Sequence, residues 1–82
     1  MSEILTARLT GIRLRANRKG DRWASAQLGN VEVLMFPEVY ARGSDLLVEG
    51  EQVSMRGVIK WAPDGVAMIV EEILWTLEPS HD

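Results

Sequence analysis

The chain has 82 residues, of which 46% are hydrophobic and 26% are charged, as in an ordinary small globular domain, and this composition excludes a disordered chain. It has no cysteine, which excludes disulfides and thiolate metal sites, and no apolar run approaches the roughly 20 residues of a membrane-spanning helix. The net charge of −3 is unevenly distributed along the chain, because residues 1–22 carry a net +4 and residues 23–82 a net −7.

The first predicted strand begins near residue 5 and bends at a glycine. Alternate residues are apolar through residues 5–9, and after Gly11 the alternation changes phase so that Ile12 and Leu14 continue the apolar face. Arg13 and Arg15 then occupy the opposite face. Residues 17–21 are polar and contain a glycine, which indicates a basic hairpin loop.

Residues 23–28 form the second predicted strand, with small or apolar residues alternating with Trp23, Ser25 and Gln27. The dipeptide at 29–30, Gly-Asn, is typical of a tight hairpin turn, so the third strand over residues 31–35 is an antiparallel neighbour of the second. We expect the side chains of one face to point into a barrel. The inward residues are Ala24, Ala26, Leu28, Val31, Val33 and Met35.

A short helix is predicted within residues 37–47, because Pro37 suits the first helical position and the apolar alternation stops there. Gly43 weakens or ends it, and Phe36 offers no capping oxygen at its start. We expect Phe36 and Tyr40 to be core or helix anchors. Val39, Leu46 and Leu47 should pack inward with Tyr40.

The fourth strand follows the turn at Glu49-Gly50, and the fifth covers residues 66–77 after a turn at 61–65. The fifth strand is apolar enough to be buried on much of both sides, and we expect Trp75 to pack against the barrel. Met55 and Met68, like Met35, fall at inward positions and should fill gaps in the core. The inward residues of the fourth strand are Val53, Met55, Gly57 and Ile59.

Three strands, a short helix and two more strands predict an all-β fold, a five-stranded OB-fold barrel with a short helix between strands 3 and 4. Closure hides the strand edges that an open sheet would expose. A barrel of the SH3 type is the main rival. The expected organisation is a single domain over residues 1–82, with the barrel at about 4–77 and a disordered tail at 78–82.

Three stretches resemble the OB domain of the bacterial DNA polymerase III alpha subunit, in particular its actinobacterial members. They are Gly-Asp-Arg-Trp-Ala-Ser-Ala-Gln-Leu at 20–28, Val-Glu-Val-Leu-Met-Phe-Pro-Glu-Val-Tyr at 31–40 and Val-Ser-Met-Arg-Gly-Val at 53–58. In that family the OB domain lies late in a much longer chain, and the resemblance implies single-stranded DNA binding in replication. It carries over no polymerase or nuclease carboxylate. Both an excised domain and a free-standing homologue, such as one carried by a phage or plasmid, fit these residues.

Cations and aromatic rings mark the expected ligand surface, because phosphates attract cations and unpaired bases stack on rings. The first hairpin supplies most of the cations, and Trp23 should point outward beside them. Trp61 is placed in the loop between strands four and five, the second customary contact loop of the fold. The candidate nucleic-acid-binding residues are Arg13, Arg15, Arg18, Lys19, Arg22, Trp23, Arg56, Lys60 and Trp61.

Catalysis is not expected, because the chain has one histidine, His81 in the tail, no cysteine and no glycine-rich phosphate loop. Glu71 and Glu72 are the only adjacent acidic pair, and neighbours on a strand point to opposite faces unless the strand bulges. We expect no cofactor, metal, membrane or small-molecule substrate, and a cytoplasmic location. The alternative function is a protein-interaction module that docks a replisome or host protein, and RNA remains open as the bound strand.

Overall fold

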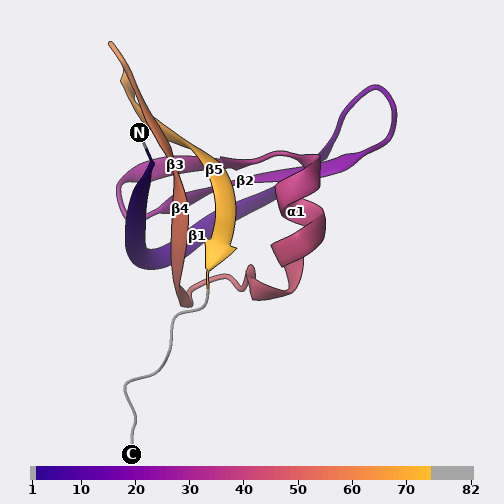
Figure 1. Ribbon diagram of the computed structural model, residues 1–82, viewed down its shortest axis with the longest axis horizontal. Coiled ribbons are helices and arrows are strands. Elements are labelled where there is room, and N and C mark those ends of the chain that lie inside the picture. The colour runs from indigo at the N-terminus through magenta and orange to yellow at the C-terminus, as the bar shows by residue number, and fades with distance from the viewer. Residues whose placement is uncertain (1, 75–82) are drawn as a thin grey trace, which may run out of the picture.

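Five strands close into a barrel, with one short helix between the third and fourth strands (Figure 1). The structure, a computed structural model, describes residues 2–74; the predictions for Trp75, for the end of the fifth strand and for the tail lie outside these residues. The elements are β1 (Glu3–Ala16), β2 (Arg22–Leu28), β3 (Val31–Met35), α1 (Pro37–Gly43), the 3₁₀ turn η1 (Ser44–Leu46), β4 (Gln52–Ala62) and β5 (Gly65–Leu74).

The strand order around the barrel is β1-β2-β3-β5-β4, and β4 pairs with β1 to close it. All pairs are antiparallel except β3 with β5, where the chain has passed through α1 and β4 between the two strands. The predicted fold class, including the position of the helix, is confirmed. In the described part of the chain, no helix is long and apolar enough to cross a membrane.

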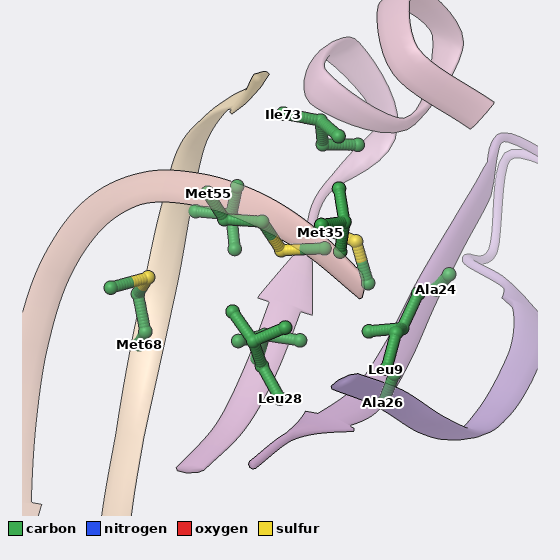
Figure 2. Close-up of a cluster of buried hydrophobic side chains, with 11 residues drawn as sticks. Leu9, Ala24, Ala26, Leu28, Met35, Met55, Met68 and Ile73 are labelled. Carbon is green, nitrogen blue, oxygen red and sulfur yellow. The ribbon is translucent and has the colours of Figure 1, made fainter. Parts of the chain in front are cut away.

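The core is built from the inward residues of all five strands, as the alternation predicts. Met35, Met55 and Met68 are fully buried, which confirms their predicted inward positions, and Figure 2 shows them entering one cluster from β3, β4 and β5. Ala24 and Ala26 of β2 are small and leave room in the core for these long side chains. The buried hydrophobic residues of the core are Leu9, Ala24, Ala26, Leu28, Val33, Met35, Val53, Met55, Met68, Val70 and Ile73.

The helix α1 begins at Pro37 without a side-chain cap and ends at Gly43, as predicted. Gly43 is buried against β5, where an added Cβ would lie 2.8 Å from Cδ1 of Ile73, so the absence of a side chain allows the helix to pack closely on the strand. Val39 and Tyr40 pack against the core as expected, together with the two leucines that follow the helix. These contacts fix α1 to the barrel.

A β-bulge at Gly11 changes the phase of β1, as the sequence predicts. Thr10 pairs with Gln27 and Arg13 with Ser25, so two residues of β1 face one residue of β2. Gly11 has a φ of 64°, which glycine adopts readily. One expectation for this strand is wrong: Leu14 is 63% exposed, because β1 and β2 continue beyond the core as the hairpin that projects past α1 in Figure 1.

A second bulge lies in β5 opposite Gly57. Arg56 pairs with Glu72 but Gly57 pairs with Val70, which leaves Glu71 as the extra residue. An added Cβ on Gly57 would collide with the carbonyl oxygen of Ile69 and lie 2.9 Å from the Cα of Val70, so β5 can approach only a glycine here. The bulge in β5 therefore depends on the close contact between its backbone and Gly57 of β4.

Candidate nucleic-acid interface

A groove crosses the outer face of the barrel, from the β1–β2 hairpin at one end to the β4–β5 hairpin at the other. It consists of two adjoining hollows of about 320 and 330 Å³, and Gln27 and Glu32 line both. These two residues are direct cross-strand partners on β2 and β3; Glu32 pairs in turn with Ala67, and Ala67 with Lys60. Three inter-strand spacings separate Gln27 from Lys60, a distance of about 15 Å.

The first hollow is lined by cations from β1. Arg13 and Arg15 lie there beside Ser25, because the bulge at Gly11 has turned both arginines to the outer face. Nε of Arg15 donates to Oγ of Ser25 at 3.4 Å. Ser25 was expected on the outer face and does line the hollow, but it is only 5% exposed.

The bulge that orients these arginines is held by a carboxylate from the connection before β4. The side chain of Glu49 accepts hydrogen bonds from the backbone N–H groups of Gly11 and Ile12, at 2.8 and 3.2 Å. Hydrogen bonds to an ionised acceptor are stronger than those between neutral groups. Glu49 therefore supports the strand geometry that places Arg13 and Arg15 in the groove.

Trp23 is less available than the sequence suggests. Its ring is half-buried, lies 5.6 Å between centroids from the ring of Phe36, and has the guanidinium of Arg15 5.4 Å from its own centroid. Such a cation–π contact orients the arginine as well as the ring. Phe36, expected as a core or helix anchor, is 43% exposed and so is not a core residue; it stands at the N-cap of α1, where its carbonyl accepts a hydrogen bond from the N–H of Tyr40 at 2.8 Å.

The loop at the tip of the first hairpin is ordered by Asn17. Its side-chain oxygen accepts hydrogen bonds from the N–H groups of Lys19 and Asp21, both at 2.9 Å, and its backbone N–H donates to the carbonyl of Asp21 at 3.0 Å. This Asx turn is a common way for asparagine to fix a short loop. Arg18, Lys19 and Arg22 are exposed on and beside it.

The second hollow ends at the hairpin between β4 and β5. Lys60 and Asp64 line it, together with the amides of Gln27 and Asn30. The predicted turn over 61–65 is shorter than expected, because Trp61 pairs with Val66 and Ala62 with Gly65. Trp61 therefore lies in β4 rather than in a loop, and it is 81% exposed.

Arg56 differs from the other candidate cations because it is already paired. Its two terminal nitrogens contact Glu71 at 2.7 Å and Glu72 at 2.9 Å. Neighbours on a regular strand point to opposite faces, but the bulge at Glu71 allows both carboxylates to reach the same guanidinium. The hydrogen bond to Glu72 is the main cause of a raised pKa for Arg56. Arg56 lines a separate hollow beside α1 and neither part of the groove.

The remaining candidate cations have no carboxylate partner within residues 2–74, where both ion pairs belong to Arg56. Of the predicted site residues, Arg13, Arg15 and Lys60 line one groove. The basic loop with Arg18 and Lys19 lies at the end of the β1–β2 hairpin, and Trp61 lies in the β4–β5 hairpin. Arg56 lies apart from the groove. Four residues were not identified as candidates from the sequence: Gln27 and Glu32 at the centre of the groove, Glu49 at the bulge, and Phe36 against Trp23. The cross-strand position of Gln27 and Glu32 follows from the two-residue turn at 29–30, which was a usable signal.

The chain is similar to the DNA polymerase III subunit alpha of Mycobacterium tuberculosis, in strains CDC 1551 / Oshkosh and ATCC 25618 / H37Rv. In each case 30% of 69 aligned residues are identical, which covers 79% of this chain and 6% of the relative. The chain therefore spans only a small part of the curated relatives that it matches. No family model matches it. The distant similarity and the closed five-stranded barrel are together consistent with an OB-like domain.

Proposed function

We propose that this chain is a non-catalytic OB module of DNA replication that binds single-stranded nucleic acid along the groove. The observation that carries the proposal is the groove, in which Arg13 and Arg15 line one end and Lys60 the other, none of them in an ion pair with a residue of the described range. OB barrels bind oligonucleotides on this face and with the loops of the first and last hairpins. The similarity to a polymerase subunit supports the same function.

The groove suits a flexible single strand better than a duplex. A strand lying across β2 and β3 would place phosphates near Arg13 and Arg15 at one end and near Lys60 at the other. Trp61 follows Lys60 on β4 and so points to the opposite face, and it does not line the groove. Its open ring is available to a base of a strand that continues past the end of the β4–β5 hairpin, whereas Trp23 already has Phe36 and Arg15 beside it. We therefore assign base stacking to Trp61 and a supporting role to Trp23.

The test is a fluorescence anisotropy titration of a labelled mixed-sequence single strand, at low and at moderate salt, with a duplex of the same sequence as the control. We expect tighter binding of the single strand and an affinity that falls steeply with salt, because bound phosphates release counterions. An absence of binding even at low salt, or a preference for the duplex, would contradict the proposal.

Charge removal on the ordered loop provides the first specific prediction. Replacing Arg18, Lys19 and Arg22 together by glutamine should weaken single-strand binding and lower the slope of log affinity against log salt by about 2, since each phosphate contact contributes about 0.7. Stability should change little because the three side chains are exposed. A control replaces Arg8 and Arg42, two exposed arginines outside both the first hairpin loop and the groove, by glutamine and should leave the slope unchanged. An unchanged slope in the triple variant would exclude a contact between this loop and the strand.

A protein-interaction module is the second candidate, and the exposed tryptophan favours it. Trp61 is 81% exposed at the end of a projecting hairpin, and tryptophan is a frequent anchor in protein interfaces. The net −7 over residues 23–82 could meet a basic partner. A pull-down with the immobilised chain and purified replication proteins tests this function; recovery of none of them, together with single-strand binding, would dismiss it.

A further inference from the structure

The centre of the groove carries an unpaired carboxylate, which a surface built only for phosphates would not have. Glu32 is exposed, lines both hollows, and forms no hydrogen bond or ion pair with any residue of the described range 2–74. The amide of its cross-strand partner Gln27 likewise has no hydrogen-bond partner among the described residues. A ligand lying in the groove must therefore approach both side chains.

The position of Glu32 restricts how a single strand can lie. Its negative charge repels phosphates, and they are attracted instead to Arg13 and Arg15 in the first hollow and to Lys60 in the second. With the backbone held at the two ends, the bases are the parts of the strand that face the centre. Glu32 and Gln27 then meet the hydrogen-bonding edges of bases.

On the basis of the proposed function, we infer that Glu32, with Gln27, is a specificity-determining residue that favours bases carrying an exocyclic amino group, cytosine above all, over thymine. An ionised carboxylate only accepts hydrogen bonds, and the N4 amino group of cytosine donates them. Thymine presents a carbonyl oxygen at the same position, which a carboxylate repels. Asp64, which lines the second hollow, adds a further acceptor of the same kind.

The experiment compares oligodeoxycytidylate and oligodeoxythymidylate of equal length in the anisotropy assay, above neutral pH so that both remain single-stranded. We expect wild-type protein to bind the cytosine oligomer about fivefold more tightly, the lower end of the discrimination seen for a well-placed hydrogen-bonding pair. In Glu32→Gln the amide can donate as well as accept, so the ratio should approach one while binding of the thymine oligomer tightens. The matched control is Glu38→Gln on α1, which removes the same charge outside the groove and should keep the ratio.

The outcomes separate this inference from the proposed function. If neither oligomer binds wild-type protein at low salt, the proposed function itself fails. If both bind with equal affinity, or the thymine oligomer binds more tightly, the function stands and the base preference is overturned. A cytosine preference that persists in Glu32→Gln would show that another part of the groove selects the base. The wild-type comparison requires no variant, so it remains decisive even if a substitution affects folding.

Discussion

The two bulges of the barrel have opposite effects on charge. In β1, the extra residue at Gly11 turns Arg13 and Arg15 onto the outer face, where neither has a carboxylate partner within residues 2–74. In β5, the extra residue Glu71 joins Glu72 beside Arg56 and pairs with it. A bulge adds one residue and re-aims the side chains around it, whichever strand contains it.

The difference shows that the position of a cation in the sequence does not decide whether it is available to a ligand. Arg13 and Arg56 both belong to barrel strands, and both were candidates for contact with nucleic acid. The residue on the neighbouring strand decides whether each arginine is already paired with a carboxylate. Ser25 of β2 lies opposite Arg13, whereas Glu72 of β5 lies opposite Arg56. Three experiments test this contrast, in order of decreasing expected effect.

Removing the close approach behind the second bulge should have the largest effect. In Gly57→Ala the added methyl would lie 2.8 Å from Cγ of Met68 and against the backbone of β5, so the free energy of unfolding should fall by about 2–3 kcal/mol. Urea denaturation measures it. The control, Gly20→Ala, has open space at a φ of 88° and should lose about 1 kcal/mol from backbone strain alone. Equal losses in the two variants would contradict the role given to Gly57.

Removing the support of the first bulge should have an intermediate effect that also reaches the groove. Glu49→Ala leaves the N–H groups of Gly11 and Ile12 without their acceptor, and we expect a loss of about 1 kcal/mol in unfolding free energy. Single-strand binding should weaken as well, since the bulge orients Arg13. Glu51→Ala is the control, because Glu51 is exposed and its side chain has no partner within the described residues. A loss of stability without a change in single-strand binding would contradict the claim that the bulge at Gly11 orients Arg13 for the ligand.

The smallest effect, and the most direct test of the contrast, is on salt dependence. Arg13→Gln should lower the slope of log affinity against log salt by about 0.7, the contribution of one phosphate contact on a single strand. Arg56→Gln should leave the slope unchanged, because two carboxylates already occupy that guanidinium. Anisotropy titrations at several salt concentrations measure both. Equal changes in the two variants would mean that pairing does not withhold Arg56 from the ligand.

The features that local sequence controls were predictable. The phase change at Gly11 shifts the apolar pattern of its own strand, so the outward positions of Arg13 and Arg15 could be predicted without the fold. The inward methionines and the end of α1 at Gly43 follow from the same alternation and from glycine's low helix propensity. In each case the determining residues are neighbours in the sequence.

The features that depend on strands distant in the sequence were not predictable in this way. The bulge at Glu71 arises where β5 meets the bare backbone of Gly57, so nothing in the local pattern reveals that Glu71 and Glu72 will both reach Arg56. Trp61 was placed in a loop because Pro63 and Gly65 resemble a longer turn, whereas pairing with Val66 extends the strand. Glu32 has no such signal in the sequence, because a single-strand surface is marked by cations and aromatic rings and a carboxylate is neither.

The Asx turn at Asn17 means that the cationic hairpin tip is shaped before any ligand arrives. Fixing the backbone of a flexible loop costs about 1–2 kcal/mol for each residue, and a loop that is ordered only on binding loses that amount from its affinity. Here one asparagine closes the turn during folding through three hydrogen bonds to Lys19 and Asp21. The cations of the tip are thus pre-organised, and a partner that meets them needs to restrict only their side chains.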